Sequence, residues 1–411
     1  MAFLNVALVA LGAISVYTAW AKLRAWHKLR HIPGPFWARW SHLWLVKQIY
    51  TGTYVDQLSR LHAEYGPIVL LSPDMVATSD PAAIRQISSA RSAWGRGPLY
   101  LGFRTAPGED SLFSQPDRKK HEILRRKLVG GYSGKSVGLG RVHDMIDERV
   151  LKLVELIRSK YVASANDDRT FDLSRLIKFL TTDTISSFAF QRSFGCLDRD
   201  GDFHGYLEMT GKIAPPMVAA CLMPCFQKLQ DTPSLKPLLP KGGFLKPILD
   251  IAKEVVAERF SQDKIDRDDV LGVWVSNGLT QREAEVETVG QLAVRIEYLL
   301  QSEIDDAIKG NVISSPITES EVKSMPYLQA VVKESLRVFP PVHMTPRTSA
   351  SDEMVCGSKV PAGISVEFSM RPALRDQAIF GNDADMFRPE RWIEAEDTSR
   401  LQPMEDALKF V

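Results

Sequence analysis

The chain has 411 residues, of which 45% are hydrophobic and 25% are charged, enough to fill one large core or two ordinary ones. Its formal net charge of +1 gives no reason to expect nucleic acid or another polyanion as a partner. The four cysteines form no Cys-x-x-Cys pair and no histidine-containing cluster with metal-site spacing, so we expect neither a disulfide framework nor a metal site from Cys196, Cys221, Cys225 and Cys356.

The first 21 residues are apolar enough to span a membrane. No charge occurs from Ala2 to Ala21, about one membrane thickness, and a basic stretch starts at Lys22. A cleaved signal peptide and a buried core helix are the alternatives, but a signal peptide carries its positive charge before a shorter apolar core. We therefore predict a single transmembrane helix at residues 1–21, with its basic side in the cytoplasm.

A basic hinge is predicted at residues 22–38. Its Ile32-Pro33-Gly34-Pro35 stretch cannot continue a helix, because proline lacks the backbone donor and restricts the residue before it. Residues 39–411 then form the folded body.

The body is predicted to be mainly α-helical with small β-sheets. Residues 68–71 and 75–79 flank a Ser-Pro-Asp turn and indicate a β-hairpin. A second hairpin is predicted between Val355 and Phe368, with its turn at Pro361-Ala362-Gly363.

Helices are indicated by caps and by apolar periodicity. Asp80 followed by Pro81 predicts an N-cap and the first position of a helix. Apolar residues recur at helical spacing over 142–157, and residues 171–190 are similar. Residues 215–247 contain seven prolines, which favour a loop-rich segment; a connector with an apolar underside and a mobile or membrane-dipping lid both stay open.

A further helix is predicted after a capping box formed by Thr280 and Glu283. The apolar spacing then continues as one amphipathic helix that ends at Gly310.

Near its end the chain carries the pattern that is most informative about its family. Glu334 and Arg337 lie three apart on an apolar helix that a double proline ends, and such a spacing places both on one helix face. Glu122 and Arg125 have the same spacing, so the pair alone proves little. A later Phe-Arg-Pro-Glu-Arg-Trp segment supplies Arg391, and a buried glutamate flanked by two arginines would brace the helix against this segment.

Taken together, these motifs resemble a cytochrome P-450 of the microsomal type that fungi use in secondary metabolism. The resemblance rests on their order: the apolar N-terminus, Pro-Gly-Pro, Tyr-Gly-Pro before a hairpin, Lys-Glu-Ser-Leu-Arg, Pro-Arg and Phe-Arg-Pro-Glu-Arg-Trp. It implies an endoplasmic reticulum membrane protein whose body faces the cytoplasm. It also implies a heme b cofactor, a lipophilic substrate, and an NADPH-dependent reductase as partner.

The resemblance assigns roles to individual residues. Glu334, Arg337 and Arg391 match the family's structural triad. His121, Arg125 and Arg347 match its heme-propionate contacts, since cationic donors suit carboxylates. The alternative for His121 and Arg125 is a solvated basic surface, because arginines and lysines crowd residues 118–127.

Two features of the family are expected but not found in these residues. The family's iron ligand is a cysteine thiolate in a glycine-containing loop after the Pro-Glu-Arg segment, and none of the four cysteines has such surroundings. The family also has an Ala-Gly-x-Asp/Glu-Thr stretch on its oxygen-binding helix. We find no such acid and alcohol pair in the helix after Thr280; Asp183-Thr184 lacks the Ala-Gly, and an interval between Gln291 and Tyr298 looks deleted.

Two hypotheses follow. In the first, the chain is an incomplete cytochrome P-450 fold, truncated before its cysteine loop, that does not bind heme stably and is catalytically inactive. In the second, it represents an active monooxygenase that oxidises a lipophilic metabolite, and its gene model is truncated or mis-spliced.

Overall fold

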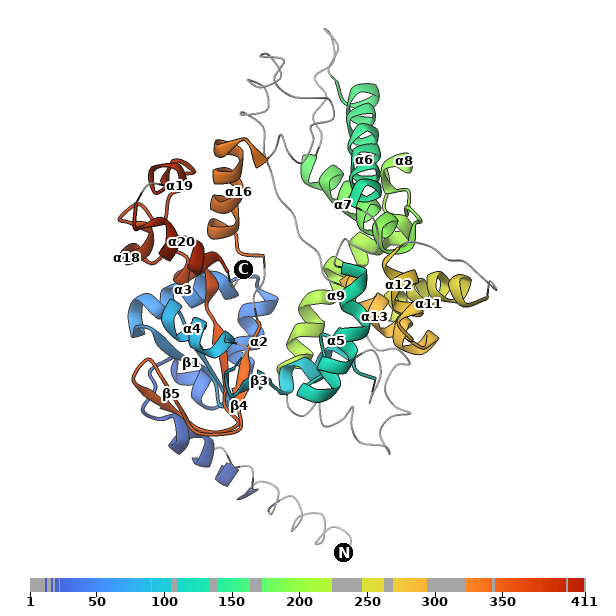
Figure 1. The fold of residues 1–411 in the computed structure, drawn as a ribbon. Helices are drawn as coiled ribbons and strands as arrows, with labels where there is room; N and C mark the ends of the chain where they lie inside the picture. The colour runs from blue at the N-terminus through green and yellow to red at the C-terminus, as the bar shows by residue number, and fades with distance from the viewer. Residues whose placement is uncertain are drawn as a thin grey trace, which may run out of the picture. The chain divides into compact units, whose positions relative to one another are not determined.

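The computed structural model describes residues 12, 16–17, 19–21, 23–89, 91–104, 109–132, 139–162, 172–223, 246–261, 269–293, 323–341, 344–396 and 398–409. They form two compact units, one made of Met1–Leu99 and Ala330–Val411, and the other of Tyr100–Gln329 (Figure 1). The described residues are mainly helical with small sheets, which confirms the predicted fold class at this level.

The first unit contains the sheets. Its five-stranded sheet has the order β1-β2-β7-β4-β3, and its two-stranded sheet pairs β5 with β6. The strands are β1 (Ile68–Ser72), β2 (Met75–Thr78), β3 (Trp94–Arg96), β4 (Arg347–Ser349), β5 (Glu353–Val355), β6 (Ser358–Val360) and β7 (Ser365–Phe368).

The hairpin predicted near residues 68–79 is confirmed, since β1 and β2 pair antiparallel. The second hairpin prediction was wrong about the turn. The chain reverses at Cys356 and Gly357, whose φ angles of 49° and 74° suit a tight hairpin turn. Strand β7 instead pairs with the distant strands β2 and β4, so Pro361 to Gly363 connect two sheets.

Helices surround these sheets in the first unit. They are η1 (Phe36–Arg39), α2 (Leu43–Tyr50), α3 (Tyr54–Tyr65), α4 (Pro81–Ser88), α17 (Met370–Ala373), α18 (Gln377–Phe380), α19 (Glu390–Glu394), α20 (Leu401–Leu408) and most of α16 (Pro326–Val338). Asp80 caps α4 as predicted, because its side chain accepts a hydrogen bond from the Ala82 N–H and Pro81 is the first helical residue.

Residues 29–34, part of the predicted hinge, are packed into the first unit. Leu29 and Ile32 are buried in its core, and a Cβ on Gly34 would lie 2.7 Å from the Leu70 carbonyl oxygen. Most of the predicted membrane span at residues 1–21 lies outside the described residues, which include only positions 12, 16–17 and 19–21 of it. In the part that is described, none of the helices has the length and apolar character needed to cross a bilayer.

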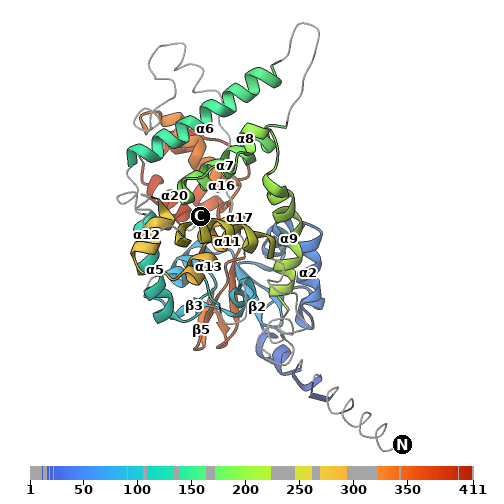
Figure 2. The same cartoon turned by 90° about the vertical axis from the view of Figure 1, so that its right-hand side faces the viewer.

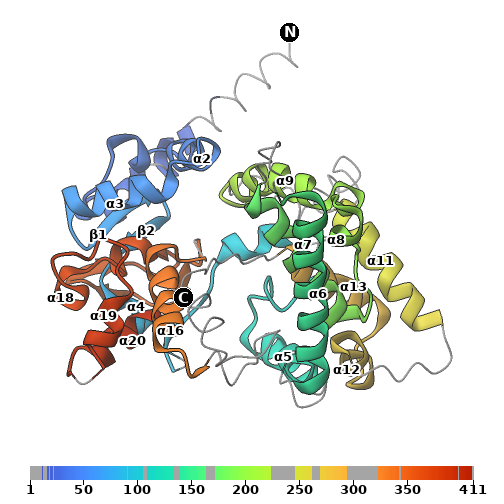
Figure 3. The same cartoon turned by 90° about the horizontal axis from the view of Figure 1, so that it is seen from above.

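The second unit is helical. Its elements are η2 (Pro98–Phe103), which begins in the first unit, α5 (Arg118–Tyr132), α6 (Leu139–Lys160), α7 (Leu173–Phe190), α8 (Cys196–Arg199), η3 (Phe203–Gly205), α9 (Tyr206–Cys221), α11 (Lys246–Ser261), α12 (Val270–Ser276) and α13 (Gln281–Ala293). Helices α6 and α7 cover the two predicted helical ranges and pack side by side (Figure 3). Helix α13 packs against α11 (Figure 2).

The predicted start of the loop, residue 215, was wrong because the preceding helix is longer than expected. Helix α9 continues through Pro215 and Pro216 to Cys221. The lost backbone hydrogen bonds are offset by burial of the last turn, where Ala219, Cys221 and Leu222 are almost inaccessible. Residues 224–245, the rest of the predicted loop, and 294–310, the end of the predicted helix, lie outside the described residues.

Candidate functional site

The three charged residues predicted to form a brace lie together in the first unit. Helix α16 carries Glu334 and Arg337, and helix α19 carries Arg391. The Arg337 Nη2 atom lies 2.8 Å from Glu334 Oε1, and the Arg391 Nε atom lies 3.1 Å from the same oxygen. Because none of the three residues is more than 3% exposed, these contacts are made without water.

Two further donors complete the environment of Glu334. The Trp392 indole N–H donates to Glu334 Oε2 at 3.0 Å, and the Arg388 backbone N–H donates to Oε1 at 2.8 Å. The sequence analysis missed both, although Trp392 directly follows Arg391. Every acceptor of the carboxylate is therefore used, as a buried charge requires.

The two guanidinium groups also fix the chain between α17 and α19. Arg337 donates to the carbonyl oxygens of Leu374, Ala384 and Met386. Arg391 donates to those of Phe380, Asp383 and Met386. Arginine suits this task because its planar group carries five donors.

The electrostatics of the brace are balanced. Burial raises the pKa of Glu334, but hydrogen bonds from Arg337, the Arg388 N–H and Trp392 and the charge of Arg337 hold it below its ordinary value. Asp383 supplies a second carboxylate, 3.0 Å from Arg391 Nη1. The guanidinium groups of Arg337 and Arg391 thus contact two carboxylates, and that of Arg388 pairs with Asp383 as well, at 2.8 Å.

The predicted heme-propionate residues lie in different units. His121 and Arg125 belong to α5 in the second unit, whereas Arg347 begins β4 in the first. The Arg125 side chain is 60% exposed and lies 4.0 Å from Glu122, a weak surface pair. In its own unit the Arg125 side chain is thus exposed, and its contact with a heme propionate stays a prediction.

The cysteines do not suit a thiolate ligand. Burial raises the pKa of Cys196 and of Cys221 to about 12, and it also raises the pKa of Cys356. Without a bound metal ion these three thiols stay protonated at neutral pH, and Cys196 and Cys221 are fully buried, whereas the family's iron ligand is a thiolate that faces the heme. Cys225 lies outside the described residues, and those that are described contain no cluster of three or more metal-ligating side chains.

Helix α13 contains an acid and hydroxyl pair that the sequence analysis missed. Glu287 and Thr288 are adjacent and buried, but, like Asp183-Thr184, they lack the Ala-Gly of the family's oxygen-binding stretch. The Leu112 N–H donates to Glu287 Oε1 at 2.7 Å. Burial is the main cause that raises the pKa of Glu287 to about 7, and the charge of Glu283 adds to it.

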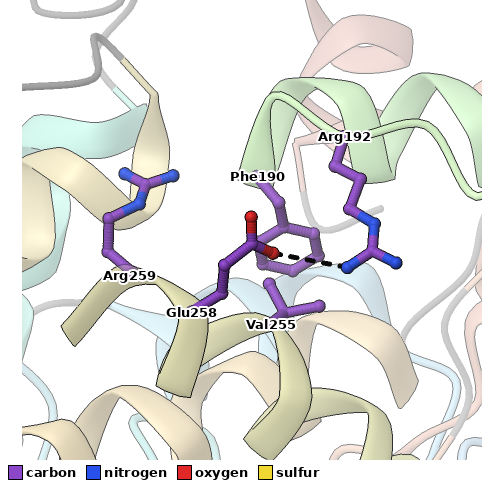
Figure 4. Close-up of a pocket in the computed structure, with 5 residues that line it drawn as sticks. All are labelled: Phe190, Arg192, Val255, Glu258 and Arg259. Atoms are coloured by element: carbon purple, nitrogen blue, oxygen red, sulfur yellow. Dashed lines mark hydrogen bonds and ion pairs between the residues drawn. The ribbon is translucent and has the colours of Figure 1, made fainter. Parts of the chain in front are cut away.

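A small pocket in the second unit is not a substrate site. It lies between α7 and α11, and Arg192 reaches across it to Glu258 at 3.4 Å (Figure 4). Its volume of about 10 Å³ has room for about one water molecule.

Comparison with known proteins gives a consistent result along the chain. The profile of the family described as Cytochrome P-450 matches residues 31–271 and 295–405. The chain is 30% identical to the cytochrome P-450 monooxygenase ABA1 of Pyricularia oryzae, over 95% of this chain and 83% of that protein. It is 33% identical to aba1 of Botryotinia fuckeliana, over 90% of this chain and 78% of that protein.

Two further findings concern how much of its relatives the chain covers. The cytochrome P-450 monooxygenase mpaDE of Penicillium brevicompactum is 27% identical over 97% of this chain and 50% of its own length. The alignment with ABA1 spans 427 positions, more than the 411 residues of the chain. ABA1 therefore has residues within the aligned region that have no counterpart here.

Proposed function

Because this chain belongs to the cytochrome P-450 family, we propose that it derives from fungal monooxygenases that oxidise a lipophilic small molecule in secondary metabolism. We further propose that these 411 residues, by themselves, form the family's scaffold without its oxidant. The observation that carries the first part is the buried brace of Glu334, Arg337 and Arg391, which matches the family's structural triad.

The state of the cysteines supports the second part. A heme with a thiolate ligand would supply the activation of dioxygen, and this chemistry needs a cysteine that loses its proton. Cys196, Cys221 and Cys356 have raised pKa values, and two of the three are fully buried.

A spectrum tests this proposal directly. The full chain, purified in detergent with heme supplied during expression, is reduced and exposed to carbon monoxide. We expect no Soret band of the thiolate-heme type, whereas ABA1 prepared in the same way should give one. The thiolate-type band from this chain would refute the proposal.

An active monooxygenase is the second candidate, and the comparisons give it specific support. The family profile is interrupted at residues 272–294, and ABA1 has residues without counterparts in this chain. Transcripts that insert residues near Leu292, or that continue in frame beyond Val411 into a cysteine-containing loop, would favour this candidate. Transcripts that encode only these 411 residues would count against it. If this second candidate is correct, the protein receives electrons from an NADPH-dependent reductase and acts on a lipophilic substrate.

We also propose that residues 1–21 anchor the chain in the endoplasmic reticulum membrane. The uncharged run and the basic stretch that follows support this. A fusion of residues 1–29 to a fluorescent protein should localise to this membrane. The same fusion with Leu8→Arg and Leu11→Arg should not, and a secreted or diffuse product from the unmodified fusion would contradict the anchor.

A further inference from the structure

Glu367 occupies an unusual place for a carboxyl group, the central strand of the five-stranded sheet. Strand β7 pairs with β2 on one side and β4 on the other, and Glu367 lies opposite Ala77. It is fully buried, with 0% exposure. A glutamate in the middle of a sheet costs free energy unless its oxygens find partners.

One oxygen of Glu367 holds a distant backbone segment. The Met344 N–H donates to Glu367 Oε1 at 2.7 Å, and the Thr345 N–H also bonds to this carboxyl. Met344 has a φ of 62°, a conformation that a bulky side chain rarely adopts and that surrounding contacts must maintain. The segment leads directly into Arg347, the first residue of β4.

The other oxygen of Glu367, Oε2, has no hydrogen-bond partner among the described residues. The Tyr54 hydroxyl of α3 also lacks one, and both atoms are buried. Burial, and then the charge of Glu367, raise the pKa of Tyr54, so the two side chains are close enough to interact electrostatically. An unpaired carboxylate oxygen is far more costly here than the O–H of a carboxylic acid.

We propose that Glu367 acts as a neutral carboxylic acid that positions the segment from Met344 to Arg347, and that its ionisation releases this segment from the sheet. This role is independent of heme and goes beyond the proposed function. A positioning role explains why a glutamate occupies a buried site where an apolar side chain would cost less free energy to bury.

The surrounding groups compensate the charge of an ionised Glu367 only in part. Burial raises the pKa of Glu367 to about 8, and the bonds from Met344 and Thr345 and the charge of Arg347 only partly oppose this effect. On α3, Asp56 pairs with Arg371, and the His62 Nε2 atom bonds to the Ser369 hydroxyl. On β2, the residue opposite is an alanine.

The sign of the pH effect follows. When the segment is released, Glu367 on β7 meets water and regains an ordinary pKa near 4.5, whereas in the closed state it holds its proton up to about 8. The closed state therefore binds more protons and loses stability as pH rises from about 4.5 to about 8. Above that range Glu367 is ionised in both states, so the stability of the closed state no longer depends on this group.

Hydrogen exchange of the full chain, corrected for the intrinsic rate, tests this. The opening constant of the Met344 amide should rise about tenfold per pH unit between about pH 5.5 and 7.5. The Ser369 amide, which donates to the Thr78 carbonyl at 2.9 Å in the same unit, serves as the internal control. A local opening of this bond leaves Glu367 buried, so its opening constant should not follow that of the Met344 amide. Glu367→Gln keeps a carbonyl acceptor and should remove the dependence, while Glu396→Gln at an exposed position should not change it.

Two outcomes would overturn the proposal. One is a Met344 amide that follows the Ser369 amide at every pH, which would show that only global opening is measured. The other is a pH dependence that persists in Glu367→Gln. If Glu367→Gln does not fold, the comparison of the two amides in the wild-type chain still decides the matter.

Discussion

At the scale of single residues, Glu334 is the acceptor on which the brace depends. It receives hydrogen bonds from Arg337, Arg391, Trp392 and the Arg388 backbone. Removing it would take away the carboxylate that Arg337 contacts and leave Arg391 with Asp383, which also pairs with Arg388. Removing one partner of a buried ion pair costs more free energy than the intact pair contributes to stability, because the remaining charge stays buried without a partner.

Glu334→Ala should therefore lower the free energy of unfolding of the first unit by about 3–5 kcal/mol. Urea unfolding followed by near-UV circular dichroism would measure the loss. Asp352→Ala is a suitable control in the same unit, because Asp352 pairs with Lys359 at 2.7 Å on the surface. The control should cost less than about 1 kcal/mol. Equal losses in both variants would show that the brace is not a buried ionic site.

Glu287 gives a pH prediction in the second unit. Its pKa in the folded chain is about 7, above the ordinary 4.5, so the folded state binds the extra proton and becomes less stable as pH rises between these values. The wild-type chain should lose on the order of 3 kcal/mol over this range relative to Glu287→Gln. Unfolding at about pH 5 and pH 7.5 measures the difference. Glu155→Gln, at an exposed position on α6, should behave like the wild type, and a Glu287→Gln variant with unchanged pH dependence would contradict the argument.

At the scale of elements, local signals predicted helix starts well. Asp80 accepts from the Ala82 N–H at 2.8 Å, and the capping box is present, with the Thr280 N–H donating to Glu283 Oε2 at 2.9 Å. Caps depend on residues within one turn, so their geometry follows from sequence. The ends of elements were predicted less well. Helix α9 continues past residue 215, and the chain turns between β5 and β6 instead of at Pro361 to Gly363. Core packing decides where an element stops, and it depends on distant residues.

Asp80→Ala should lower the free energy of unfolding by about 1 kcal/mol, because α4 loses the acceptor for its first free N–H group. Asp80→Asn keeps a capping oxygen and should lose only a few tenths of this amount. Thermal unfolding of the three chains would compare them. The Asp80 Oδ2 atom also lies 3.6 Å from the Cys356 thiol. A loss in Asp80→Asn as large as in Asp80→Ala would show that the negative charge of Asp80, and not its capping oxygen, stabilises the fold.

At the scale of the whole molecule, each unit has its own hydrophobic core. One core gathers buried residues between Leu128 and Val289, and the other gathers residues from Leu29 to Trp94 and from Ala330 to Ala407. The first unit is assembled from both ends of the chain, a pairing that periodicity could not reveal.

Separate cores predict separate responses to substitution. Glu334→Ala should speed hydrogen exchange in β1, β2 and β7 of the first unit and leave α6 and α7 of the second unit unchanged. Mass spectrometry of peptic peptides resolves these elements. An equal change in both units would show that they unfold as one cooperative body.

The sequence by itself determined the family, because an ordered set of local motifs such as Glu334 to Arg337 and Phe387 to Trp392 is specific even when each motif is weak. It also determined helix starts and the first hairpin, which depend on neighbouring residues. Only the tertiary structure decided that Trp392 completes the brace, that β7 lies between β2 and β4, and that Glu287 and Glu367 are buried acids. Burial and strand pairing depend on residues far apart in the chain, and the cost of a charge depends on the solvent that those residues exclude.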